Sequence, residues 1–398
     1  MASYPTSIVN LTPKVLNDVL LITDVNNLQD EVEAIETELG VAPSGAYSTT
    51  VQRLDNLVNE NLLINGDMSI CQEWGYSLTN GNVANGEYLT DNFIYRKTNS
   101  TTVDFTHLTY TFSTVGNSNK AIALTLTALT ATAAGDYHVI STFIPGNKIG
   151  RHAAASTDDY TLQFTIRAED SGTMCISFRN AAATMNYIAE VSITASTDQL
   201  KTITLKMPGA GTWEAANSIG IMISWCLAAG ATYHTGAGGW TTTAAFASTN
   251  QSNWFSDSFY LSNVKFERGM IATEFVPPDP AKNIIDCQHY YEVSYDRDDA
   301  VGQATTTIGR INLGRSPNIA VTQNGSRLFA TPKRSIPTVS IYNPSTGGVN
   351  SANDISSTNN YSTTSNNVST TGFNVSTDAV IASVGILTLH FEADARFG

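Results

Sequence analysis

The sequence is poor in charged side chains, and positive charge is the scarcer sign. Charged residues make up 14% of the 398 residues, with 21 Lys and Arg against 35 Asp and Glu, which gives a formal net charge of −14. Globular proteins usually carry about 25% charged residues. An acidic chain repels phosphate backbones, so nucleic acid is not expected as a partner. Anionic membrane surfaces are disfavoured for the same reason.

Cysteine is scarce, and its spacing excludes the usual frameworks. The chain has four cysteines with no close pair, which fits neither a zinc motif nor a set of disulfides, so we expect buried free thiols. The six histidines show no ligand spacing either. We therefore predict no metal and no cofactor. Short acidic runs at residues 158–159 and 296–299 leave calcium binding on a loop open, although solvated turns are the simpler interpretation.

Long apolar runs are also missing. No window approaches the roughly 18 apolar residues of a membrane span, so membrane insertion is not expected. Residues 1–10 have no basic segment followed by an apolar one, so no signal peptide is expected and synthesis in a reducing cytoplasm is predicted.

Familiar catalytic and nucleotide-binding motifs are absent from the sequence. It contains no nucleophile elbow, P-loop, dinucleotide fingerprint or HExxH motif. Repeated short turns, which would indicate a long parallel β-helix, are missing as well. Two carboxylates that hydrolyse a glycan cannot be selected from sequence alone, so a depolymerase remains the minor alternative. We assign no catalytic residue and predict that the protein is not an enzyme.

What the N-terminal segment does have is a heptad pattern. Six apolar residues alternate by four and three, namely Leu21, Val25, Leu28, Val32, Ile35 and Leu39. This stripe is narrower than that of a helix lying on its own domain, although such packing is the alternative. So short a helix is not stable alone. We predict a coiled coil supported by neighbouring modules, and the heptads do not distinguish a dimer from a trimer.

From residue 61 onward the apolar pattern changes to period two. Runs rich in Val, Ile, Thr, Phe and Tyr alternate with Gly and Asn turns, which is typical of an all-β sandwich. No long helix is expected between Leu62 and Phe275, and Trp225 is expected in the core. Residues 276–283, VPPDPAKN, read as a linker. The predicted fold is mainly β, with a short N-terminal coiled-coil segment and two jelly-roll-like β-sandwiches.

The predicted domain boundaries follow these changes of pattern. Residues 1–60 form the helical segment, 61–276 the first β-sandwich, and 277–398 a second, smaller one. Half of the excess negative charge falls in the first sixty residues.

A long insert contains candidate sugar-binding residues. It runs from Ala228 to Asn253, and loops of this length inside compact domains are usually functional or disordered. Tyr233, Trp240 and Asn250 combine aromatic rings with an amide. Sugar faces carry C–H groups that pack on rings, and sugar edges carry hydroxyls that bond amides. An equally good interpretation is that Trp240 anchors its own loop.

A second candidate surface lies in the C-terminal part. Tyr342 and Tyr361 flank or enter a Ser/Thr/Asn-rich stretch, Ser345 to Gly372, that offers many hydrogen-bonding groups. A plain solvated loop is the simpler interpretation of this stretch.

Several segments resemble, in order, the tail-fibre and receptor-binding proteins of tailed bacteriophages. NLLINGDMSICQEWG (61–75) and LTDNFIYRK (89–97) look like the opening of their carbohydrate-binding-like jelly roll. FYLSNVKFERGMIATEF (259–275) is similar to its closing strand. DCQHYYEV (286–293) and LTLHFEADARF (387–397) resemble the start and end of the module that follows in such fibres.

The resemblance implies a virion protein. It further implies a homotrimer. In this assembly the N-terminal segment attaches to other virion proteins and the C-terminal module points outward. The expected partner is a bacterial surface polysaccharide that is bound without being cut. A head fibre or decoration protein with a structural role is the nearest alternative, and a glycan depolymerase is the less favoured one.

Overall fold

The computed structural model forms two compact units, residues 1–59 and 60–398. It describes residues 25–26, 28–30, 32–33, 60–75, 79–112, 118–155, 157–253, 258–306, 309–315, 323–357, 359–377 and 385–397. No helix within these ranges is long and apolar enough to cross a membrane.

In the first unit, the described residues are helical. Val25, Leu28 and Val32 of the predicted seam lie on this helix and are 48%, 54% and 46% exposed. Leu21, Ile35 and Leu39 lie outside the described residues. Whether the seam binds other copies of the chain therefore stays a prediction.

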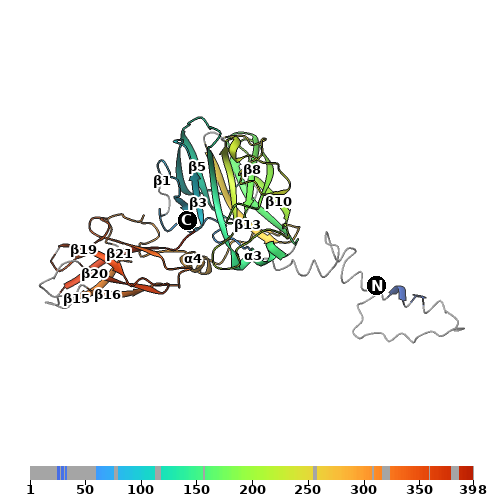
Figure 1. The fold of residues 1–398 in the computed structure, drawn as a ribbon. Helices are drawn as coiled ribbons and strands as arrows, with labels where there is room; N and C mark the ends of the chain where they lie inside the picture. Colours follow the sequence, from blue (N-terminus) through green and yellow to red (C-terminus); the bar gives the residue numbers. More distant parts are fainter. Residues whose placement is uncertain are drawn as a thin grey trace. The chain divides into compact units, whose positions relative to one another are not determined.

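The second unit is mainly β and sandwich-like, as predicted (Figure 1). Its first sandwich has two antiparallel sheets. Sheet A has the order β1 (Thr79–Asn80), β4 (Thr102–Thr109), β5 (Lys120–Ala128), β13 (Ser258–Arg268), β7 (Asp159–Ala168) and β10 (Gln199–Lys206). Sheet B has the order β12 (Trp240–Thr241), β9 (Asn186–Ile193), β8 (Gly172–Arg179), β11 (Ile219–Ala229), β6 (Tyr137–Pro145), β3 (Phe93–Lys97) and β2 (Tyr88–Thr90).

The core of the first sandwich lies between these sheets. Trp225 of sheet B is fully buried, as expected, and its ring centroid is 6.2 Å from that of Phe93 and 5.6 Å from that of Phe164 in sheet A. Strand β4 shows the predicted alternation, since Val103 and Phe105 are buried while Asp104 is less so. Strands β6 and β11 are instead buried along nearly their whole length. Both faces of sheet B are therefore covered in its centre.

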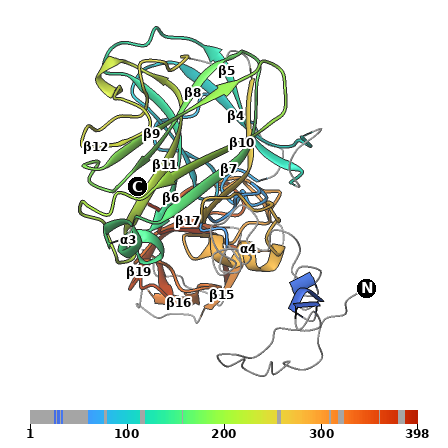
Figure 2. The same cartoon turned by 90° about the vertical axis from the view of Figure 1, so that its right-hand side faces the viewer.

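A helix that the sequence analysis did not anticipate follows β6. Helix α3 (Gly146–Ala155) contains two glycines and no strong start signal, so its intrinsic helix propensity is low. It is held by packing, because Ile149 and Ala153 are fully buried and lie one turn apart. Gly220 of β11 allows the close approach, since a Cβ there would lie 2.7 Å from the Cα of Gly146. Figure 2 shows α3 beside the strands of sheet B.

Part of the predicted linker is helical. Helix α4 (Pro280–Gln288) begins within residues 276–283, and the Asp279 carboxylate caps it by accepting from the backbone N–H groups of Ala281 and Lys282. Proline suits the first turn of a helix, where no N–H partner is available. The proline-rich segment is therefore partly a connection between the sandwiches and partly the first turn of a helix.

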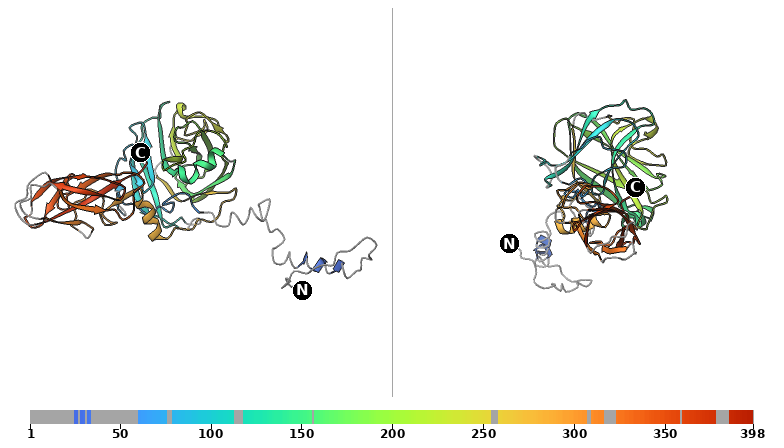
Figure 3. Two further views of the ribbon diagram at one scale, coloured as in Figure 1. Left: turned by 60° about the horizontal axis from the view of Figure 1, so that its bottom comes forward. Right: turned by 90° about the vertical axis from the view of Figure 1, so that its left-hand side faces the viewer.

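The second sandwich, drawn from orange to red in Figure 3, is built around its last strand. Its strands are β14 (Tyr291–Val293), β15 (Ile311–Arg315), β16 (Gln323–Leu328), β17 (Thr338–Tyr342), β18 (Ser351–Asp354), β19 (Asn360–Asn366), β20 (Gly372–Thr377) and β21 (Gly385–Asp394). Strand β21 pairs with β14, β15, β17 and β18. Strands β18 and β19 come from the Ser/Thr/Asn-rich stretch. Phe329, Phe373 and Phe391 pack together in the core.

Two fully buried histidines make the first sandwich sensitive to acid. Burial lowers the pKa of both His107 and His138 to about 4, from an ordinary value of 6.5. Between these pH values the unfolded chain binds more protons than the folded one. The stabilisation is therefore complete above pH 6.5. As the pH falls towards 4, the free energy of unfolding decreases by about 3 kcal/mol for each histidine.

We expect His138→Asn to lose less stability between pH 7 and pH 4.5 than the control His289→Asn. Denaturant unfolding at the two pH values measures this. Comparing variants isolates the histidine, because burial raises the pKa of Asp67 and Asp91 and these carboxyls act in the opposite sense. Equal losses in the two variants would contradict the prediction.

Candidate functional site

A row of serines crosses the face of sheet B that points away from the core. Ser224 of β11 pairs with Ser177 of β8 on one side and with Ser141 of β6 on the other. All three are fully buried, and the Oγ atoms of Ser141 and Ser224 are 2.8 Å apart. The Ser177 Oγ is buried with no hydrogen-bond partner. The unpaired Ser177 hydroxyl is unusual, because buried hydroxyls nearly always have hydrogen-bond partners.

Two arginines reach across this face towards the same methionine. The Nη1 atom of Arg96 in β3 lies 3.5 Å from the Met222 Sδ, and the Nη2 atom of Arg179 in β8 lies 4.0 Å from it. Both are half-buried. Neither forms an ion pair with any carboxylate among the described residues, and the Arg179 Nε is buried without a partner. Burial, with the positive charge of Arg96, lowers the pKa of Arg179 to about 10. We call Arg96 and Arg179 the arginine pair.

An aromatic cluster lies beside the arginine pair. The ring centroids of Tyr137 in β6 and Tyr233 in the insert are 4.9 Å apart, in an edge-to-face arrangement. Phe246, also from the insert, is 4.6 Å from Tyr137, and the Arg179 guanidinium lies 4.2 Å from its ring centroid. Both tyrosines are partly buried. The insert therefore folds back over one end of sheet B and presents rings next to a cation.

The residues selected from the insert are placed in two locations. Tyr233 belongs to this cluster. Asn250 is exposed and donates to the Glu190 carboxylate of β9, at 3.2 Å. Trp240 lies at the sheet edge, where its Nε1 donates to the Lys206 carbonyl at 2.7 Å and its ring is 5.6 Å from those of Trp213 and Tyr187. These contacts are the ones expected if Trp240 anchors its own loop to the sandwich.

The residues selected from the C-terminal part lie in the second sandwich. Tyr342 donates from its hydroxyl to the Glu392 Oε2 at 2.7 Å. Tyr361 is half-buried against the core of that sandwich. The structure does not bring either residue to the face that carries Tyr233. Binding by all five selected residues stays a prediction.

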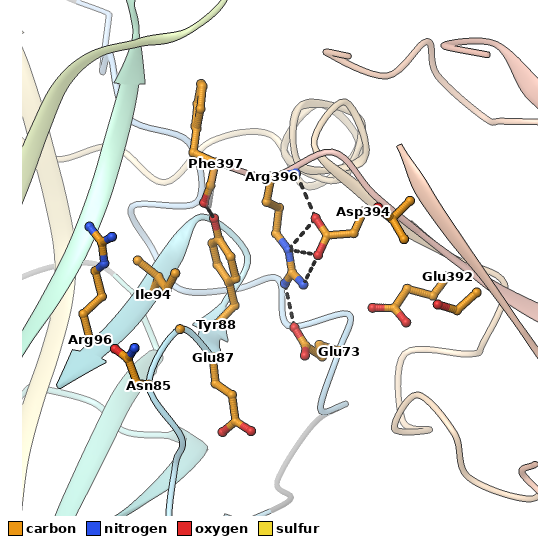
Figure 4. A pocket seen from close by; sticks show the side chains of 13 residues that line it. Glu73, Asn85, Glu87, Tyr88, Ile94, Arg96, Glu392, Asp394, Arg396 and Phe397 are labelled. Carbon is orange, nitrogen blue, oxygen red and sulfur yellow. Dashed lines mark hydrogen bonds and ion pairs between the residues drawn. The ribbon is translucent and has the colours of Figure 1, made fainter. Parts of the chain in front are cut away.

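A cavity of about 650 Å³ extends from Arg96 to the junction of the two sandwiches (Figure 4). Ile94 and Arg96 line it from sheet B, and Ser340 and Glu392 line it from the second sandwich. Sequence analysis missed this cavity, because its walls come from residues more than 200 positions apart and no local pattern marks them.

Arg396 dominates the junction side of the cavity. Its guanidinium lies 2.6 Å from the Glu73 Oε2 and 2.7 Å from the Asp394 Oδ2, and it is stacked between the rings of Tyr88 and Tyr291 at 3.9 and 3.8 Å. Burial raises the pKa of Glu73 to about 7, and the ion pair with Arg396 limits that rise. The Tyr88 hydroxyl donates to the Phe397 carbonyl. In Figure 4, Arg96 lies apart from this paired group.

No group of three His, Cys, Asp or Glu residues in the described part of the chain is placed to hold a metal ion. The four cysteines are free and buried, and burial raises the pKa of each thiol. What the face offers to a ligand is tyrosine rings and guanidinium groups; the serine hydroxyls beneath them are fully buried.

Fold and site together define a two-sandwich β protein with a polar, arginine-bearing sheet face. No protein-family model matches the chain, and no curated protein matches it. Solved structures with a similar fold include one described as "CBM4 structure and function", at 13% identity and a TM-score of 0.27, which covers 52% of this chain and 99% of that one.

Two further structures are similar in the same way. A family 11 carbohydrate-binding module of a Clostridium thermocellum cellulase is 11% identical, with a TM-score of 0.26 and coverage of 50% of this chain and 100% of that one. The enzymatically active domain of tailspike protein 4 of bacteriophage CBA120 is 12% identical, with a TM-score of 0.25 and coverage of 48% and 21%. Likeness at this level carries no inference about what this chain binds.

Proposed function

We propose that this chain is a bacteriophage fibre or receptor-binding protein that binds host surface polysaccharide without cleaving it. The observation that carries the proposal is the outer face of sheet B, where the partly buried rings of Tyr137 and Tyr233 lie beside Arg179. Tyrosine rings pack on the C–H faces of sugars, and guanidinium groups donate to their oxygens. Sheet A also places Tyr260 opposite Arg167, but that guanidinium is ion-paired with Glu169 and Asp198, whereas Arg179 has no ion-pair partner among the described residues.

Binding without cleavage is supported by the state of the carboxylates that line the cavity. Glu73 and Asp394 are both ion-paired with Arg396, and Glu392 accepts from the hydroxyls of Tyr291 and Tyr342. A glycosidase needs one carboxylic acid that donates a proton and a second carboxylate that is available to a water molecule or to the sugar. The fourth carboxylate of the lining, Glu87, accepts from the Asn80 amide and the Ala84 backbone N–H, so all four are engaged by other groups.

In the proposed assembly, three chains join through the N-terminal segment, and residues 1–60 attach them to the particle. The exposed apolar side chains of Val25, Leu28 and Val32 support this, because a seam of such residues is stabilised by packing against other copies. The C-terminal sandwich then points outward from the virion. Light scattering on the purified protein should give the mass of three chains.

Retention on host envelope glycans tests the function. We expect the purified protein to be retained and to release no new reducing ends. New reducing ends would indicate a depolymerase, and absence of retention would favour a structural head fibre or decoration protein.

A matched pair of tyrosine variants locates the binding face. Tyr233→Ala should weaken retention by about 1 to 3 kcal/mol, the scale of losing one aromatic anchor. Tyr260→Ala is the control, because Tyr260 is likewise partly buried and its ring is stacked 4.5 Å from that of Tyr110, but it lies on sheet A. Circular dichroism should show both variants folded. Equal retention of the two variants would remove the outer face of sheet B from the site.

A further inference from the structure

We infer that the saccharide bound on the outer face of sheet B is anionic, and that Arg96 and Arg179 together hold its carboxylate or phosphate group. This inference rests on the proposed function and specifies the class of ligand. It begins from an imbalance of charge. Two guanidinium groups approach one sulfur atom, at 3.5 and 4.0 Å, and no described carboxylate pairs with either.

Arg396, which lines the same cavity as Arg96, is an example of an arginine with a structural role in this chain. Arg396 is 6% exposed, pairs with two carboxylates and is stacked between two tyrosines. Arg167 likewise pairs with Glu169 and Asp198. Arginine favours carboxylates and phosphates because its planar set of donors matches two oxygens at once. The arginine pair has the donors, but among the described residues no carboxylate accepts from it; the recorded acceptor is the weakly accepting sulfur of Met222.

The surroundings of the arginine pair add buried donors, and the carboxylates that share the cavity with Arg96 are engaged by other groups. Glu73 and Asp394 pair with Arg396, and Glu392 accepts from two tyrosine hydroxyls. Ser177 lies two residues before Arg179 on the same face of β8, and its buried Oγ has no partner, as is true of the Arg179 Nε. Two more carboxylates, one on β9 and one in the cavity wall, are also engaged. Glu190 accepts from Ser248 and Asn250, and Glu87 accepts from the Asn80 amide and the Ala84 backbone N–H.

Leaving two like charges close together without a counter-ion is costly, and so is leaving a buried donor unpaired. Burial and Arg96 both lower the pKa of Arg179, which reports the cost of holding this charge next to a second one, although the guanidinium stays charged at neutral pH. An oxyanion placed between the guanidinium groups relieves both costs. A neutral sugar hydroxyl satisfies a donor but leaves the repulsion in place. An acidic saccharide is therefore the ligand that this face fits, although the chain as a whole is acidic.

Affinity electrophoresis of the full-length protein tests the inference. The probes are polygalacturonate, hyaluronate and alginate for carboxylates, poly(glycerol phosphate) for phosphates, and dextran and galactan as neutral controls. We expect retardation by at least one acidic polymer and none by the neutral ones. The polymer class that retards the protein distinguishes carboxylate from phosphate. Retardation should weaken as salt is raised, because charge pairing is screened.

Charge-removing variants complete the design. Arg96→Gln and Arg179→Gln should each lower the affinity for the retarding polymer by about 10- to 100-fold, the scale of a lost charged hydrogen bond. Arg327→Gln is the control, because it makes the same change in net charge at an exposed position of β16. If only neutral polymers retard the protein, or if the three variants bind alike, the inference is wrong and the proposed function stands. If no polymer retards the protein, both fail.

Discussion

Replacing Lys333 with methionine should lower the free energy of unfolding of the second sandwich by about 3 to 5 kcal/mol. Lys333 and Glu292 are each only 3% exposed, and the Lys333 Nζ lies 2.6 Å from the Glu292 Oε2. The ammonium group also donates to the carbonyls of Gln288 and Thr331, at 2.6 and 2.7 Å. Methionine keeps the apolar stem but leaves a buried carboxylate without its cation. Breaking a buried pair in this way costs far more than the pair itself contributes.

The double variant Lys333→Met/Glu292→Gln distinguishes two contributions to this loss, the missing ion pair and the buried carboxylate that has no cation. Glutamine keeps an oxygen acceptor for the Ala330 backbone N–H, which lies 2.9 Å from the Glu292 Oε1. Denaturant unfolding followed by circular dichroism should show the double variant recovering at least half of the loss. A single variant that costs less than about 1 kcal/mol, the range of exposed ion pairs, would show that this pair is solvated.

Replacing Arg396 with alanine should destabilise the junction of the two sandwiches by a similar amount, about 3 to 5 kcal/mol. Arg396 links Glu73 of the first sandwich to Asp394 of the second, and its guanidinium fills the space between the rings of Tyr88 and Tyr291. The substitution removes both stacking contacts and leaves two carboxylates facing each other. Each stacked cation–π contact contributes about 0.5 to 2 kcal/mol on its own.

The loss in Arg396→Ala should depend on pH in a defined direction. Burial already holds the pKa of Glu73 at about 7, and without its cation this pKa rises further. A carboxyl whose pKa is higher in the folded state contributes stability when the pH is below its pKa in the unfolded chain. This stability is lost as the pH rises through the pKa of the folded state. The variant should therefore be less impaired at pH 5 than at pH 8.

Hydrogen exchange of the β2, β14 and β21 amides measures opening of the junction. Arg327→Ala provides the control, because Arg327 is exposed on β16 and is not part of the junction. Exchange that is equally fast in Arg396→Ala and in the control would mean that other contacts hold the sandwiches together. One such contact is the Phe397 ring, which lies 5.6 Å from Phe143 and 5.7 Å from Tyr290.

Much of the fold was readable from the sequence, because strands are specified by a local pattern. Period-two alternation of apolar and polar residues places one side of a strand in a core whatever its neighbours are. Strand β4 shows this alternation, and the buried Trp225 follows from the same rule. Helix α3 was missed for the converse reason, since its glycine-containing segment is helical only because Ile149 and Ala153 pack against the sandwich.

The candidate site was readable only in part. Tyr233 was selected because a tyrosine in a long, glycine-rich insert is a plausible sugar platform, and it lies on the outer face of sheet B. Trp240 was selected by the same reasoning but closes the edge of the core. An insert's composition does not say which of its aromatic residues turn inward. That depends on the gaps left by other strands, here the space near Trp213 and Tyr187.

The sequence by itself determined the mainly β class, the low charge that disfavours nucleic acid, and the heptad pattern of the N-terminal segment, because each is a property of composition or short-range period. Only the tertiary structure decided that Arg96 and Arg179 reach the same methionine above a row of serines. Those residues come from separate strands, and their meeting depends on sheet order and register. A one-residue slip of any one strand would turn its side chain into the core, and no local pattern records that choice.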